Sequence, residues 1–328
     1  MTYFVARYDF RCPTGNATPR HELYAAALDQ AAYCEASGFD SLVLSEHHGT
    51  ADGYLPSPLI AAAAMTARTS TIPITVAALL ARLHDPLRLA EDIAVLDHLS
   101  RGRVTYVFGL GYRRAEYEMF DRDWSTRGED LETAIRTILT AWQGEPFEHD
   151  GRTVTVTPTP FSQPHPFLFY GGGSTATARR AARLGLGFYP QSPDPELARV
   201  YREESEAQGR RPGLVMQPPA GPANVFCAEE PEEFWDRYGP HLLADATSYA
   251  EWQSDTTSLV RDASSSIDEM RDAGVYVVWT PDELVERCRS GEVGLVTANP
   301  LCGGLPPEAG GESLRLLGDV VIPALRSH

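Results

Sequence analysis

Short apolar segments alternate with longer amphipathic segments along most of the chain. In the first half, apolar segments at 3–10, 39–46, 72–80, 103–111 and 167–173 predict strands, and helical patterns follow them. The second half is less regular, but apolar segments at 186–191, 223–230 and 292–300 continue the alternation. Eight strand–helix units predict an α/β fold, namely a single-domain (β/α)8 TIM barrel with insertions.

Two stretches interrupt this alternation. Residues 145–164 are rich in Thr and Pro and predict a surface hairpin. Residues 245–275 are polar and weakly periodic, so we expect a long insertion that is mobile or acts as a lid.

The composition narrows the class of ligand. The formal net charge of -17 argues against nucleic acid or an anionic membrane surface, because both are bound by clusters of basic residues. All 28 basic residues are arginine. The absence of lysine excludes Schiff-base enzymes, pyridoxal-phosphate enzymes and Walker-type phosphate loops. We therefore expect a small-molecule substrate.

The cysteines and the lengths of the apolar segments indicate the cellular compartment of the protein. The five cysteines are far apart, lack the paired spacing of a zinc site and are odd in number. The N-terminal segment carries Arg7, Asp9 and Arg11, which is unlike a signal peptide. No apolar run approaches the ~20 residues that a membrane helix needs. A cytoplasmic protein without a metal site is expected.

An acid and two histidines, Glu46, His47 and His48, follow the second predicted strand. Active sites of β/α barrels lie at the C-terminal ends of the strands, which is where these residues fall. Successive strand residues point to opposite faces, so one imidazole would face the mouth of the barrel and could move protons near neutral pH. The structural alternative is a histidine that only caps the strand.

A glycine-rich turn and an arginine are candidates for phosphate binding. The fifth predicted strand ends at Gly171, Gly172 and Gly173, and the next helix starts with Ser174 and carries Thr177 in its first turn. Glycines allow close backbone approach, and a helix N-terminus offers free N–H donors to phosphate. The alternative is an ordinary helix cap. Arg127 opens another helix and could donate to a phosphate, or it could be a solvated surface residue.

Small residues at two further strand ends could accept a planar ligand. Gly109 and Gly111 form only a fragment of a dinucleotide-binding fingerprint, which lacks its third glycine. Ala77 and Ala78 end the third predicted strand and would leave room for a flat ring system, unless they merely pack against large core side chains.

Together, five stretches of the chain resemble the bacterial luciferase-like family of flavin-dependent monooxygenases and oxidoreductases, in the order and spacing of that family. The resemblance covers nearly the whole chain, so a single domain over 1–328 is expected. It implies a (β/α)8 barrel that holds reduced FMN at its mouth, a homodimer, and an NAD(P)H:flavin reductase as the source of reduced flavin. The stretches are residues 38–49, 84–104, 109–120, 169–185 and 300–325.

The resemblance also implies roles for single residues. His47 would lie beside the flavin and manage protons, with Glu46 and His48 orienting it. The Ala77–Ala78 pair would carry a cis peptide bond under the flavin ring. The flavin phosphate would be bound by Arg127, Gly172, Gly173, Ser174 and Thr177, and Gly109 and Leu110 replace a cysteine and an arginine found beside the flavin in luciferase.

The implied reaction is oxygenation of a small organic substrate by reduced FMN and O2 through a C4a-peroxyflavin. The loop 49–58 and the stretch 245–275 would wall the substrate pocket. Three alternatives remain: a hydride-transfer oxidoreductase that uses a deazaflavin coenzyme, a non-catalytic flavin-binding subunit, and a phosphosugar isomerase or aldolase on the same barrel.

Overall fold

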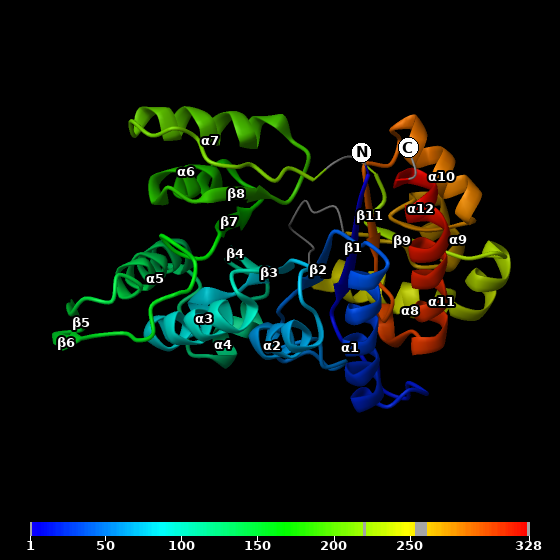
Figure 1. Cartoon of the computed structure of the whole chain (residues 1–328), viewed down its shortest axis with the longest axis horizontal. Helices are drawn as coiled ribbons and strands as arrows, with labels where there is room; N and C mark the ends of the chain where they lie inside the picture. Colours follow the sequence, from blue (N-terminus) through cyan, green and yellow to red (C-terminus); the bar gives the residue numbers. More distant parts are fainter. Residues whose placement is uncertain (1, 219–220, 253–260, 327–328) are drawn as a thin grey trace.

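A curved parallel sheet of seven strands forms the centre of the molecule, with helices along its outer face (Figure 1). The structure, a computed structural model, describes residues 2–218, 221–252 and 261–326. The strands follow the order β11-β1-β2-β3-β4-β7-β8. Their bounds are β1 Tyr3–Tyr8, β2 Ser41–Leu44, β3 Ile74–Leu79, β4 Val104–Phe108, β7 Leu168–Gly172, β8 Gly187–Pro190 and β11 Leu295–Ala298.

Helices connect the strands and bury their apolar sides against the sheet. Parallel strands need such crossovers, and helices on the outer face explain why the strand sequences are almost continuously apolar. The principal helices are α1 Arg20–Ala36, α2 Pro58–Arg68, α3 Pro86–Ser100, α5 Arg127–Ala141, α6 Thr175–Leu184, α7 Pro195–Ala207, α8 Pro231–Trp252, α10 Pro281–Ser290, α11 Pro307–Arg315 and α12 Ile322–Arg326. A short helix, α4 Arg114–Met119, follows β4.

The second half of the chain adds a smaller parallel sheet. Strand β9 (Asn224–Cys227) pairs with β10 (Tyr276–Trp279), and β9 also lies against β11. The predicted α/β fold with a parallel sheet is therefore confirmed. The sequence pattern did not predict β10, which is only four residues long and follows the polar stretch 245–275.

That polar stretch contains more regular structure than its pattern indicates. Helix α8 continues through residues 245–252, where Asp245 and Tyr249 are buried, and α9 covers Ile267–Ala273. The remaining part of the predicted lid, 253–260, lies outside the described residues.

The predicted surface hairpin is present. Strands β5 (Phe147–His149) and β6 (Arg152–Val154) pair antiparallel between α5 and β7. The buried carboxylate of Asp97 on α3 accepts hydrogen bonds from the amide and hydroxyl of Ser162, which fixes the returning segment. Within the described part of the chain, none of the helices combines the length and hydrophobicity that crossing a membrane requires.

Candidate active site

The Glu46-His47-His48 segment lies at the C-terminal edge of the sheet, just after β2. All three residues are buried, with exposed fractions of 2%, 6% and 8%. The amide of His47 donates to the carbonyl of Leu55, and Gly49 turns the chain with a φ of 62°. The loop that follows β2 therefore folds back over the histidines and removes them from water.

Glu46 is held by three donors. Its Oε1 accepts from Nε2 of His48 and Nε2 of His84, each at 2.8 Å, and its Oε2 accepts from the amide of Leu80 at 2.6 Å. Burial opposes the charge of Glu46, but the hydrogen bonds from His48 and His84 outweigh it and lower its pKa to about 2. Glu46 is thus an ionised anchor between β2 and the end of β3.

Glu46, His48 and His84 also form a group that could hold a metal ion, since their ligand atoms lie within 4.8 Å of one another. His84 was not among the residues singled out from the sequence. In the structure both imidazoles instead share one carboxylate oxygen, so the contacts they make are hydrogen bonds that fix the loop.

The imidazole of His47 is placed between two other side chains. Its Nδ1 lies 2.8 Å from Oε1 of Glu116, and its Nε2 lies 2.8 Å from the hydroxyl of Tyr112. Burial lowers the pKa of His47, which the contact with Glu116 only partly offsets. His47 is therefore a neutral imidazole near neutral pH, with both ring nitrogens engaged.

Glu116 on α4 is the carboxylate that orients His47. Its Oε1 also accepts from the amide of His48 at 2.9 Å and from Nη1 of Arg113 at 3.0 Å. Burial would raise the pKa of Glu116, but the hydrogen bond from His47 and its other donors lower it overall. Glu46, the expected orienting acid, contacts His48 rather than the ring of His47.

Aromatic rings surround His47. The rings of Tyr54, Tyr112 and Trp252 lie 4.8, 5.1 and 5.1 Å from its ring, centre to centre. The guanidinium of Arg113 lies 4.4 Å from the centre of the Trp252 ring. These side chains come from the loop after β2, the loop after β4 and the end of α8, and their rings form a wall beside His47.

Small residues lie at the ends of β3 and β4, where these strands reach the site. The peptide bond between Ala77 and Ala78 is cis, as the resemblance implies, and the carbonyl of Ala77 accepts from the hydroxyl of Ser45 at 2.9 Å. A Cβ at Gly109 would lie 2.6 Å from Cβ of Ala78. Glycine is therefore required for β4 to pass this close to β3, and Leu110, next to it, packs partly buried against the core.

The glycine-rich turn after β7 forms a complete capping box at the start of α6. The hydroxyl of Ser174 accepts from the amide of Thr177, and the Thr177 side chain pairs with the backbone of Ser174. A Cβ at Gly172 would lie 2.7 Å from the Thr177 side chain. The alternative of a helix cap therefore describes the contacts that Ser174 and Thr177 make in this structure.

Arg127 is the first residue of α5. Its Nη1 donates to the carbonyl of Trp124 at 2.8 Å, and its guanidinium lies 3.9 Å from the Trp124 ring centre. Its Nε is buried and makes no hydrogen bond among the described residues. The guanidinium of Arg180 on α6 lies against Gly128, the neighbour of Arg127. Arg180 was not singled out from the sequence.

A second buried cluster adjoins the aromatic wall. Arg11 pairs with Asp245 at 2.8 Å and with Asp52, and its guanidinium lies 4.4 Å from the Trp252 ring centre. Asp245 also accepts from the Tyr276 hydroxyl at 2.7 Å. Through this cluster the C-terminal half of α8 is attached to the loops after β1 and β2.

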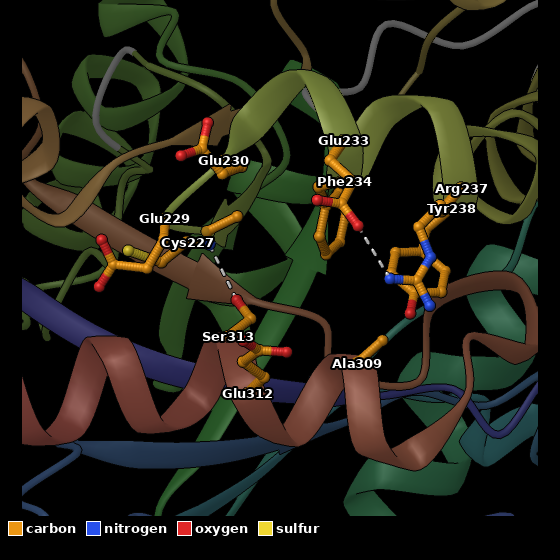
Figure 2. Close-up of a pocket in the computed structure, with 11 residues that line it drawn as sticks. Cys227, Glu229, Glu230, Glu233, Phe234, Arg237, Tyr238, Ala309, Glu312 and Ser313 are labelled. Carbon is orange, nitrogen blue, oxygen red and sulfur yellow. Dashed lines mark hydrogen bonds and ion pairs between the residues drawn. The ribbon is translucent and has the colours of Figure 1, made fainter.

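A separate pocket lies beyond β9, between the first turns of α8 and helix α11 (Figure 2). Glu229, Glu230, Glu233 and Glu312 line it, with Arg237 paired to Glu233. The charge of this pocket is opposite to what a phosphate requires, and none of the site residues predicted from the sequence lines it.

These features together are those of the luciferase-like monooxygenase family, and the chain belongs to it: the family model matches residues 6–297. Among curated proteins, the chain is 29% identical over 157 residues to the alkanal monooxygenase alpha chain of Photorhabdus luminescens, covering 46% of this chain and 43% of that protein. The chain spans about half the length of the first curated relatives it matches.

Solved structures share the whole fold. Monooxygenase RslO1 from Streptomyces bottropensis has a TM-score of 0.76 at 22% identity, covering 98% of this chain and 99% of that one. The oxygenating constituent of 3,6-diketocamphane monooxygenase from Pseudomonas putida, in complex with FMN, has a TM-score of 0.71 at 19% identity, with 98% and 99% covered. An F420-dependent secondary alcohol dehydrogenase has a TM-score of 0.69 at 16% identity, with 99% and 100% covered.

Proposed function

We propose that the chain is a flavin-dependent monooxygenase that uses reduced FMN and O2 to insert one oxygen atom into a small organic substrate. The observation that carries this proposal is the site at the C-terminal edge of β2, β3 and β4. There a buried, neutral His47 is aligned by Glu116 and Tyr112. The chain's membership of the luciferase-like monooxygenase family supports it.

The residues present suit FMN. Gly109 allows β4 to pass close to the Ala77–Ala78 peptide, and these small residues would present a flat surface to a planar ring. At the other end, the first turn of α6 offers backbone N–H groups, and Arg127 has a buried Nε without a partner among the described residues. In this proposal Gly172, Gly173, Ser174, Thr177 and Arg127 hold the phosphate, and Ala77, Ala78, Gly109 and Leu110 contact the ring.

Bound reduced FMN would supply the two electrons that activate O2; one oxygen atom enters the substrate and the other leaves as water. The chain's own contribution is to bind, to exclude water and to manage protons. The rings of Tyr54 and Trp252 shield His47 from solvent, and His47 exchanges protons with the reacting groups.

The proposal extends to the whole molecule and its partner. The curved sheet would be the larger part of a (β/α)8 barrel, with β9 beside β11 and the bridge between Phe188 and Val215 extending the wall beyond β8. The P. putida protein is described as an oxygenating constituent, which supports a separate NAD(P)H:flavin reductase as the source of reduced FMN.

A second candidate is hydride transfer with a deazaflavin coenzyme, which the F420-dependent structural neighbour favours. Anaerobic titration of the purified protein with reduced FMN and, separately, with reduced deazaflavin, followed by mixing with oxygenated buffer, distinguishes the two. We expect saturable binding of reduced FMN and a change in its rate of oxidation by O2. Binding of the deazaflavin alone, without reaction with O2, would replace the proposal with hydride transfer.

A further inference from the structure

We propose that Glu46, His48 and His84 form a binding site for one divalent transition-metal ion, and that Zn²⁺ is the ion it takes. The three side chains present two imidazole nitrogens and a carboxylate oxygen, all within 4.8 Å of one another. Two histidines and one glutamate are a ligand set that zinc uses in proteins. The sequence alone predicts no metal site, because His84 lies 38 residues along the chain from Glu46. The inference goes beyond the proposed function and does not depend on a flavin.

The two imidazoles converge on a single atom. Nε2 of His48 and Nε2 of His84 each lie 2.8 Å from Oε1 of Glu46. Ligand atoms of a tetrahedral zinc ion are about 3.3 Å apart, since each lies about 2.0–2.2 Å from the ion. Oε1 would therefore move away from each nitrogen by about 0.5 Å as the imidazoles turn towards each other. Rotations of the side chains bring the three atoms around one ion.

The surroundings orient the ligands before an ion binds. The Glu46 side chain is fully buried, and its Oε2 accepts from the amide of Leu80 at 2.6 Å. The ring of Phe120 packs edge-on against His48, with 4.8 Å between the ring centres. Contacts of this kind fix metal ligands in place and raise the affinity of a site.

An ion also has a path into the site and a favourable charge there. The side chain of His84 is 31% exposed, whereas Glu46 and His48 are buried, so solvent reaches the cluster from the side of His84. This side offers a place for water as the fourth ligand, as in zinc sites with three protein ligands. The carboxylate makes the cluster negative, and the charges of Asp92 and Arg122, which also act on His84, are opposite in sign.

Ion binding replaces the hydrogen bonds within the cluster. Each Nε2 donates a hydrogen to the ionised Glu46, whereas a metal is bound through a nitrogen lone pair. The hydrogen of each neutral ring therefore moves from Nε2 to Nδ1 through solvent when the ion enters. His47 is no ligand, because its two ring nitrogens contact Glu116 and Tyr112. The ion would therefore be structural and would fix the end of β2 to the segment before α3.

Calorimetric titration of the chelator-treated, cofactor-free protein with Zn²⁺ tests the site. We expect saturable binding of one equivalent and a Tm that rises with Zn²⁺ concentration, because the ion binds the folded chain. Mg²⁺, which prefers oxygen ligands, should give neither effect. His84→Asn should weaken Zn²⁺ binding by about 10²-fold or more, since even the loss of a residue that hydrogen-bonds a ligand costs about 10–100-fold. His98→Asn removes an exposed imidazole on α3; it is the matched control and should bind Zn²⁺ like the parent.

X-ray absorption of the zinc-loaded parent identifies the ligands even if His84→Asn fails to fold. We expect two imidazoles and oxygen ligands. Zinc–sulfur bonds are about 0.2–0.3 Å longer than zinc–nitrogen bonds, so binding by any of the five cysteines would be visible. A sulfur ligand, equal binding of Mg²⁺, no binding of Zn²⁺ by the parent, or equal affinities in His84→Asn and His98→Asn would overturn the inference. Failure of the parent to bind reduced FMN would contradict the proposed function and leave the zinc result standing.

Discussion

Gly109 lies where β4 passes closest to the Ala77–Ala78 peptide. Because a Cβ at position 109 would be 2.6 Å from Cβ of Ala78, Gly109→Ala must push β4 away from β3 or displace Ala78. We expect a loss of about 1–3 kcal/mol in the free energy of unfolding and weaker binding of reduced FMN. Urea denaturation and an anaerobic flavin titration measure the two effects.

Gly311→Ala is the matched control for Gly109→Ala. Gly311 lies within α11, far from the site in sequence, and a Cβ there would meet only Nη1 of Arg315 at 3.7 Å. Alanine favours a helix over glycine by about 0.5–1 kcal/mol, so this variant should be as stable as the parent or slightly more so. Equal losses in both variants would contradict the steric argument for Gly109.

Single residues could be predicted from the sequence where a local motif carries them. Glu46, His47 and His48 are adjacent, and their place at the end of an apolar segment predicts the strand edge on which they lie. Glu116 and His84 could not be found in this way. They reach the histidine pair from α4 and from the segment before α3, and only the folded chain brings these segments together. Glu116 follows Tyr112 by four residues in a short helix that the pattern did not predict.

Helices and strands were also harder to predict where they depend on contacts that form only in the folded chain. The strands of the seven-stranded sheet were predictable because burial on both faces makes them apolar throughout. Strand β10 was not predicted because it has only four residues and follows a polar stretch. In the structure it pairs with β9. The last turns of α8 fall in the predicted insertion 245–275, because this stretch is polar and the charge of its buried Asp245 is compensated only in the fold by Arg11.

Helix α8 depends on Arg11 for its attachment to the sheet. Arg11 is 1% exposed and faces Asp9, Asp52 and Asp245, so Arg11→Leu would remove the cation that these three acids share. We expect the free energy of unfolding to fall by about 3–5 kcal/mol, as when one partner of a buried ion pair is removed. Urea denaturation followed by circular dichroism measures it.

Arg237→Leu provides the comparison on the same helix. Arg237 pairs with Glu233 on the exposed surface of α8, as Figure 2 shows, and exposed pairs of this spacing contribute only about 0.3–0.5 kcal/mol. The variant should therefore unfold close to the parent. If Arg11→Leu were no more costly than Arg237→Leu, the buried cluster could not be what holds α8 in place.

The whole molecule exposes apolar side chains on two neighbouring helices. Ile60 on α2 is 72% exposed, and Val95 and Leu99 on α3 are 47% and 62% exposed. Helices α2 and α3 pack side by side along one edge of the molecule (Figure 1). Exposed apolar side chains on adjacent helices are a feature of protein interfaces. We propose that these two helices form the interface of a homodimer.

In a symmetric dimer the same surface is used by both copies, so one substitution places two charges in the contact. Ile60→Arg should therefore convert the dimer to a monomer, which sedimentation equilibrium measures directly. Val320→Arg is the control, because Val320 is also exposed, at 44%, but lies between α11 and α12. The Val320→Arg variant should remain a dimer. A parent protein that sediments as a monomer at high concentration, or dissociation by Val320→Arg alone, would rule out the α2–α3 interface.

The hydrogen bonds that align His47 come from the same chain. The monomeric Ile60→Arg variant should therefore still bind reduced FMN with the parent's affinity.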